Sequence, residues 1–185
     1  MDEESHIAVE IGPRTSSIIQ ALRTDLYDWD KDKALLLEKD EAWRGEMARF
    51  KMPDEEPLIA DGAKMPLKSG SVKTVFSKDV YTSDNIRILS PDGGYSSKRQ
   101  RIDFDGIAAE SMRVLEPGGK AVVLETASPM GSEWRETRDR IKNAYTGQGF
   151  ELVEDYTELD ANKIFKDGVE VAMASDNFAL VFKKP

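Results

Sequence analysis

Short apolar runs recur along the chain, and segments with a helical pattern separate them. The runs are IAVEI from Ile7, ALLLE from Ala34, LIA from Leu58, VKTVF from Val72, AVVLE from Ala121 and FALVF from Phe178. Short strands with few polar residues are typical of a parallel sheet that helices cover on both faces. The pattern therefore predicts an α/β fold, a three-layer sandwich around a mostly parallel sheet.

Helices are predicted between several of these runs. Residues 15–17, Thr-Ser-Ser, can cap a first helix, and residues 41–50 supply a second. Apolar side chains at helical spacing from Ile107 to Leu115 predict a third. The segment from Glu133 to Tyr145 has large apolar residues near one face and charges elsewhere, so we expect an amphipathic helix on the surface.

The stretch RVLEPGGKAVVLET, from Arg113 to Thr126, places a helix end, a turn and a strand in direct succession. Pro117 cannot continue a helix, and Gly118 and Gly119 can adopt backbone angles that are closed to other residues. The apolar residues 122–124 that follow predict a strand covered on both faces.

A chain of 185 residues, 39% of them hydrophobic, can bury one sizeable core, so we expect a single domain spanning residues 1–185. The segment 83–100 contains Pro-Asp-Gly-Gly and little periodicity, which predicts a long, mobile loop. Beyond Gly149, the patterns FELVEDY and FALVFKK predict two terminal strands, joined by a long connection, that form an antiparallel pair.

The composition excludes several kinds of chemistry. With no cysteine and one histidine, the chain can form no disulfide, thiolate zinc site or histidine-rich metal site, and we expect no metal. The net charge of −9 argues against a nucleic-acid partner, since phosphate contacts need a basic face; KRQR at Lys98 to Arg101 is the only local candidate. No long apolar run or signal-peptide pattern supports membrane insertion or secretion, so we expect a cytoplasmic protein.

The residues that follow the first four apolar runs are candidates for a binding site, because parallel α/β sheets bind ligands beyond the carboxyl ends of their strands. Glu38, at the end of the second run, can accept both hydroxyl groups of a ribose. Asp61, after the third, can accept the amino group of an adenine, and Gly12 lets a ligand approach the backbone closely. The candidate cofactor-binding residues are Glu10, Gly12, Glu38, Lys39, Asp61, Gly62 and Ser77.

Together these motifs resemble those of the class I S-adenosylmethionine-dependent methyltransferases over nearly the whole chain. VEIGPRTSSI is similar to the family's glycine-rich first motif, LLLEKDEAWRGEM to the acidic strand end, and IADGAKMPLKSGSVKTVF to the third motif. RVLEPGGKAVVLE is the closest match, and GFELVE resembles the start of the sixth strand. The resemblance implies S-adenosylmethionine as cofactor and a Rossmann-like sheet of seven strands, the last antiparallel and inserted between the fifth and sixth.

Two features depart from the family's pattern. Arg14 and Ser16 occupy places where the first motif has glycines, and the Arg14 side chain would project where the cofactor's methionine and ribose usually lie. The first strand begins at Ile7, which leaves no N-terminal helices to cover the cofactor. We therefore expect an open cleft that the 83–100 loop, a protein partner or a second copy of the chain closes.

Three functions stay open at this point. The first is S-adenosylmethionine-dependent methyl transfer to a small-molecule or protein substrate; the second is a methyltransferase-like, non-catalytic binding or scaffolding module that has lost cofactor binding. The third, a dinucleotide-dependent oxidoreductase, requires a fuller glycine fingerprint than EIGPRTS provides. No catalytic residue is assigned: Asp79 can act as a general base if burial raises its pKa, but a solvated or ion-paired carboxylate is the more ordinary account.

Overall fold

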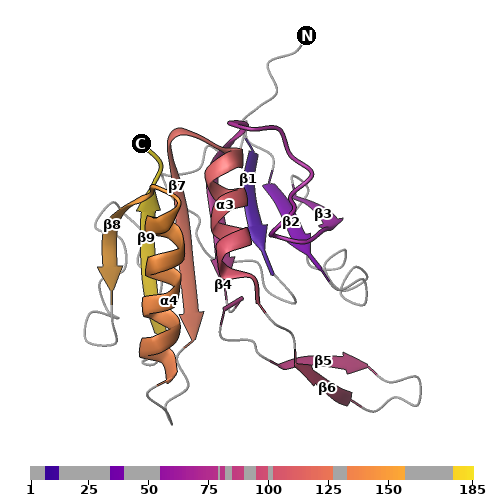
Figure 1. Ribbon diagram of the computed structural model, residues 1–185. Coiled ribbons are helices and arrows are strands. Elements are labelled where there is room, and N and C mark those ends of the chain that lie inside the picture. Colours follow the sequence, from indigo (N-terminus) through magenta and orange to yellow (C-terminus); the bar gives the residue numbers. More distant parts are fainter. Residues whose placement is uncertain are drawn as a thin grey trace.

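The computed structural model describes residues 7–12, 34–39, 55–78, 80–81, 85–89, 95–99, 102–126, 133–156 and 177–185. Seven strands form one sheet in the order β3-β2-β1-β4-β7-β9-β8 (Figure 1). They are β1 (Ile7–Ile11), β2 (Ala34–Glu38), β3 (Glu55–Ile59), β4 (Val72–Lys78), β7 (Leu115–Thr126), β8 (Glu151–Tyr156) and β9 (Asn177–Lys183).

The directions of the strands confirm the sheet that the sequence and its family resemblance predicted. Neighbours among β1, β2, β3, β4 and β7 run parallel. The last strand, β9, lies between β7 and β8 and is antiparallel to both, so β8 and β9 form the predicted terminal pair. The sheet is Rossmann-like, with its fifth, seventh and sixth strands side by side in that order.

The central strands are buried on both faces. Consecutive residues of a strand point to opposite faces, yet Val122, Val123 and Leu124 of β7 are all buried, and so are Leu36 and Leu37 of β2. A sheet with one covered face would expose every second residue. This burial confirms the predicted sandwich and explains why the runs are apolar without alternation.

Two described helices, α3 (Phe104–Val114) and α4 (Glu133–Gly147), lie side by side against one face of the sheet (Figure 1). The predicted amphipathic pattern of α4 is confirmed: Ile141 and Tyr145 are buried, and the Trp134 ring lies 6.2 Å from that of Phe178 on β9. The helices predicted from residue 15 and over 41–50 lie outside the described residues.

The Pro-Gly-Gly turn lies within the bounds of β7. Leu115 pairs with Val72, and the next pairing joins Lys120 to Thr74, so the turn interrupts the register. Gly118 has a φ of +80°, which favours glycine. A Cβ on Gly119 would lie 2.9 Å from the Lys73 carbonyl oxygen, so this close approach of two backbones also requires glycine.

The third strand differs in its bounds from the prediction. The apolar run begins at Leu58, but β3 begins at Glu55 and includes Pro57. Proline has no N–H to donate and is tolerated on an edge strand, where one side of the backbone has no neighbour. Within the described sheet β3 is such a strand, since it pairs with β2 alone.

The segment 83–100 was predicted as a long loop or flap with little periodicity, but ten of its residues form two short strands. β5 (Asn85–Leu89) and β6 (Tyr95–Arg99) form an antiparallel pair that lies apart from the main sheet (Figure 1). Alternation in Asn-Ile-Arg-Ile-Leu, followed by Pro-Asp-Gly-Gly, is the pattern of a hairpin. The mobility of this segment stays a prediction.

Candidate functional site

The carboxyl ends of β1 and β2 and the segment after β3 meet at one end of the sheet. The strand order reverses between β1 and β4, and ligands of parallel α/β sheets bind at such a reversal. The Gly12 N–H donates to the Leu37 carbonyl at 2.9 Å, and the Ala60 N–H donates to the Glu38 carbonyl at 3.0 Å. Candidate residues from three separate motifs are thus brought together.

Two glycines shape the backbone here. Gly12 has a φ of +73°, in the left-handed region that favours glycine. Gly62 has no room for a side chain, because a Cβ there would lie 2.8 Å from Ile11 Cγ2. Gly12 therefore ends β1 in a shape that few other residues adopt, and Gly62 keeps the segment after β3 in contact with β1.

The two acids on β1 and β2 differ in accessibility. Glu10 has no exposed surface, whereas Glu38, at the end of its strand, is 9% exposed. One oxygen of the Glu38 carboxylate accepts the Lys39 N–H at 2.8 Å, so the backbone that leaves β2 fixes its orientation. Of these two acids, Glu38 is the one that a ligand beyond the strands can reach.

Asp61 lies in a turn and carries its own network of polar contacts. Its Oδ1 accepts the Ala63 N–H at 3.0 Å, its carbonyl accepts the Lys64 N–H at 2.8 Å, and its Oδ2 lies 2.8 Å from Lys39 Nζ. Partial burial raises the pKa of Asp61, but the Lys39 ammonium and the Ala63 N–H outweigh this and leave the pKa below its ordinary value. The carboxylate is therefore ionised at neutral pH.

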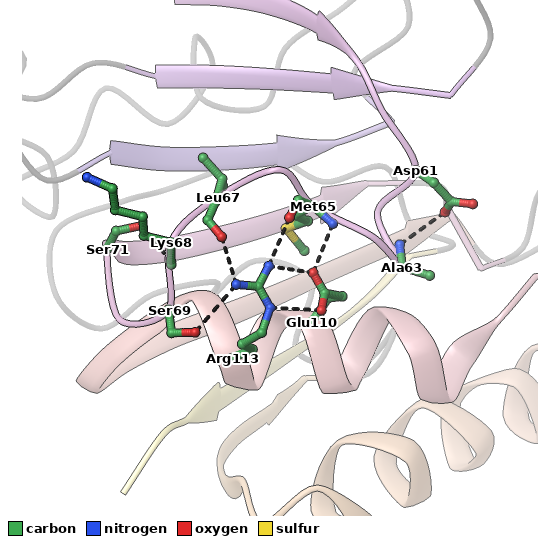
Figure 2. A network of polar contacts seen from close by, with 9 residues as sticks. All are labelled: Asp61, Ala63, Met65, Leu67, Lys68, Ser69, Ser71, Glu110 and Arg113. Atoms are coloured by element: carbon green, nitrogen blue, oxygen red, sulfur yellow. Dashed lines mark hydrogen bonds and ion pairs between the residues drawn. The ribbon is translucent and has the colours of Figure 1, made fainter.

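Residues on α3 hold the segment between β3 and β4 (Figure 2). Arg113 donates to the carbonyl oxygens of Met65 and Leu67, at 2.8 and 2.7 Å, and pairs with Glu110 on its own helix. Sequence reasoning did not single out either residue for function. Their spacing of three along a helix indicates a pair, but the contacts with residues 65–69 depend on the tertiary fold.

A second polar network lies at the ends of β4 and β7. Glu125, on β7, is 1% exposed, and its Oε1 accepts the N–H groups of Val80 and Tyr81, each at 2.9 Å. The Tyr81 hydroxyl lies 3.0 Å from that of Tyr145 on α4. Sequence reasoning missed Glu125 too, although it is an acid at a strand end. Ser77, the candidate on β4, is buried beside this network.

The two tyrosines of this network are not bases at neutral pH. Burial raises the pKa of Tyr81 well above its ordinary value, with Tyr145 and the Glu125 carboxylate adding to the rise. Burial also raises the pKa of Tyr145. Both phenols therefore keep their protons and can donate hydrogen bonds, so they fix geometry here.

Several predicted residues lie outside the described ranges. These are Arg14 and Ser16 of the first motif and Asp79 after β4. In the described part of the chain, no group of three or more histidine, aspartate or glutamate side chains is arranged to hold a metal ion. No helix among the described residues is long and apolar enough to cross a membrane.

No model of a protein family matches this sequence, and a search of curated proteins finds no significant relative. The fold, by contrast, is similar to that of many solved structures. A putative methyltransferase from Haloferax volcanii, in complex with the Trm112 methyltransferase activator, has a TM-score of 0.65 and 18% identity; the match covers 99% of this chain and 84% of that one.

Two further similar structures come from other organisms. A SAM-dependent methyltransferase from Methanosarcina mazei has a TM-score of 0.61 and 12% identity, over 98% of this chain and 93% of that one. Another is geranyl diphosphate C-methyltransferase from Streptomyces coelicolor A3(2), in complex with Mg²⁺, geranyl diphosphate and S-adenosyl-L-homocysteine. It has a TM-score of 0.62 and 12% identity, and the match covers 98% of this chain and 73% of that one. At such identities the likeness shows the fold. The chain has the fold of the class I S-adenosylmethionine-dependent methyltransferases.

Proposed function

We propose that this chain transfers a methyl group from S-adenosylmethionine to a small-molecule or protein acceptor. The observation that supports this most is the meeting of Glu38 and Asp61 at one end of the sheet. The backbone of Glu38 bonds Ala60, next to Asp61, and Lys39 bridges to the Asp61 carboxylate. These contacts link two acids from distant motifs, which supports a shared nucleoside site.

The described residues suit a nucleoside. Glu38 would accept the ribose hydroxyls, and Asp61 would accept the adenine amino group, since a carboxylate has about four acceptor positions and the Ala63 N–H and Lys39 occupy two. Gly12 and Gly62 would line the nucleoside site with backbone atoms alone. Glu10, Lys39 and Ser77 would support the site from β1, from the end of β2 and from β4.

The cofactor would supply a methyl group on a sulfonium: its sulfur would keep the electron pair of the methyl–sulfur bond, and a lone pair of the acceptor would form the new bond to the methyl carbon. The chain has to hold donor and acceptor in line and to exclude water. On the acceptor side, Glu125 would fix the backbone of Val80 and Tyr81 through its two hydrogen bonds. The proton of the acceptor would leave to solvent or to a base next to this segment.

Calorimetric titration with S-adenosylhomocysteine tests the proposal. We expect saturable binding, and a ligand concentration a hundredfold above Kd should stabilise the fold by about 2.7 kcal/mol. Asp61→Asn should weaken binding by about tenfold, because the amide presents one oxygen where the carboxylate presents two. Asp155→Asn is the matched control: Asp155 pairs with Arg138 and Lys142 between α4 and β8. No binding and no stabilisation by millimolar ligand would contradict the proposal.

One contact favours a second candidate, a methyltransferase-like binding or scaffolding module. Lys39 Nζ lies 2.8 Å from the Oδ2 atom of Asp61, the acid proposed to bind adenine. If that ion pair replaces the nucleoside, the chain binds no S-adenosylhomocysteine, and Lys39→Met restores binding. If the wild-type protein binds the ligand, this candidate fails.

We further propose that a cytoplasmic protein partner or a second copy of the chain binds beside the proposed site. The similar Haloferax volcanii protein is described in complex with an activator, which supports a partner. The molar mass in solution, measured by light scattering, separates the two arrangements: twice the chain mass of 20.7 kDa indicates a homodimer.

A further inference from the structure

The segment between β3 and β4 carries the proposed adenine-binding acid but contains no regular helix or strand. Residues 60–71 run through turns from Ala60 to Ser71. A segment without a hydrogen-bonded ladder keeps one shape only if other contacts hold it. The position of Asp61 therefore depends on the groups that surround this segment.

Arg113 supplies several of those contacts, as Figure 2 shows. Its guanidinium donates to the Leu67 carbonyl at 2.7 Å and to the Met65 carbonyl at 2.8 Å, with a longer contact of 3.5 Å to the Ser69 hydroxyl. The remaining donors bond Glu110, at 2.9 and 2.7 Å. All three nitrogens of the planar guanidinium fork thereby donate hydrogen bonds, and the ammonium group of a lysine could not form the same set of contacts.

Glu110 lies on the same helix and holds the segment together with Arg113; we call these two side chains the clamp. Its Oε2 accepts the Met65 N–H at 2.9 Å, so Met65 bonds α3 through both its N–H and its carbonyl. The Arg113 guanidinium lowers the pKa of Glu110, so the carboxylate is charged at neutral pH. The backbone also takes part, because the Gly70 N–H donates to the Arg113 carbonyl at 3.0 Å.

The start of α3 holds the other end of the segment. Gly106 lies so close that a Cβ on it would be 2.9 Å from the Ala63 Cβ. The Ala63 N–H in turn bonds the Asp61 carboxylate. A continuous set of contacts thus runs from Arg113 and Glu110, along residues 63–67, to the acid.

We propose that Glu110 and Arg113 are positioning residues for the nucleoside site, which hold the segment 61–71 in its binding shape before the ligand arrives. The inference rests on the proposed function and deepens it. Ordering a segment before binding removes a conformational cost from the binding step, so loss of the clamp should appear as lost affinity. The residues act through Asp61 and do not touch the ligand.

The experiment titrates the full chain and its variants with S-adenosylhomocysteine and with adenosine, at a temperature where every variant is folded. Arg113→Met should weaken the binding of both ligands by about tenfold. The factor should be the same for both, because the segment would face the nucleoside that they share. Arg113→Lys keeps the charge but not the fork, and we expect nearly the same loss. Glu110→Gln should weaken binding less, by about threefold, because its oxygen can still accept one bond.

Arg138→Met is the matched control. Arg138 makes a similar forked bond from helix α4 to Asp155 on β8, away from the proposed site. Arg138→Met should be less stable than the wild-type protein. Its affinities for both ligands should stay within about twofold of the wild-type values, because substitutions at distant sites act nearly independently. Amide exchange of residues 61–67 in the unliganded protein should rise in Arg113→Met and stay unchanged in Arg138→Met.

The outcomes separate this inference from the proposed function. If the wild-type chain binds no S-adenosylhomocysteine, the proposed function fails and the role of the clamp fails with it. If the wild-type chain binds but Arg113→Met binds equally well, or if Arg138→Met loses as much affinity, the inference alone is overturned.

Discussion

The carboxyl end of the sheet has two halves that are built in opposite ways. Around the end of β2, the side chains of the Lys39–Asp61 ion pair stay in contact with water and are 53% and 36% exposed, although Glu10 and Glu38 on the strands themselves are buried. Around β4 and β7, Glu125 is 1% exposed and touches the backbone of Val80 and Tyr81. Exposed ion pairs add little stability, whereas a buried carboxylate is costly unless its hydrogen bonds are complete.

The difference teaches what each half can do. A half-exposed carboxylate can exchange one partner for another, which suits the recognition of a ligand. A buried carboxylate with fixed partners holds the chain in one place, which suits the support of a reacting group. Under the proposed function, the first half would bind the nucleoside and the second would give the acceptor side its shape.

Glu125→Leu should have the largest effect on stability. It leaves the Val80 and Tyr81 N–H groups without their acceptor at a nearly dry site, and we expect a loss of about 3 kcal/mol in the free energy of unfolding. Urea unfolding measures it. Glu125→Gln, which keeps an acceptor oxygen, is the control and should lose about half as much. Equal midpoints for the wild-type protein and Glu125→Leu would remove the contrast between the two halves.

Tyr81→Phe should have an intermediate effect. It removes one hydroxyl of the buried Tyr81–Tyr145 pair and should lower the free energy of unfolding by about 1 kcal/mol. Combined with Tyr145→Phe it forms a double-mutant cycle, in which the second change should cost less than it does alone. Strictly additive losses would mean that the two hydroxyls do not stabilise each other.

Asp61→Asn should have a smaller and pH-dependent effect on stability. Because the pKa of Asp61 is lower in the folded protein than its ordinary value of 3.8, its charge stabilises the fold above that pH and ceases to do so as the pH falls through the folded pKa. The gap in the free energy of unfolding between the wild-type protein and Asp61→Asn should therefore be constant near neutrality and close below about pH 4. A gap that widens on acidification would contradict the direction of this shift.

Lys39→Met should have the smallest effect on stability. The Lys39–Asp61 pair is exposed, so its loss should change the free energy of unfolding by less than about 0.5 kcal/mol, and less still at high salt. Denaturation at low and at high ionic strength measures it. A loss as large as that of Glu125→Leu would show that the half around β1 and β2 is as rigid as its neighbour.

The parts that sequence reasoning found are those that local patterns determine. The apolar runs of β1, β2 and β4 follow from residues close together in the chain, and so does the position of Gly12, Glu38 and Asp61 at or just after strand ends; their role as ligand contacts stays a prediction. The contacts of Arg113 and Glu125 join residues 44 to 48 positions apart, and no local pattern predicts such pairs. The β5–β6 hairpin is a different case, since its alternation is present in the sequence beside a turn.

The position of β9 between β7 and β8 bears on how the protein is made. Residues 115–126 leave the ribosome well before residues 177–183, yet β9 pairs with β7 along seven positions, from Lys120 with Lys183 to Thr126 with Asn177. Until that strand emerges, β7 has an unsatisfied row of backbone groups on that side, and β8 lacks the neighbour that joins it to the sheet. This edge of β7 is therefore open to pairing with other chains until β9 is available.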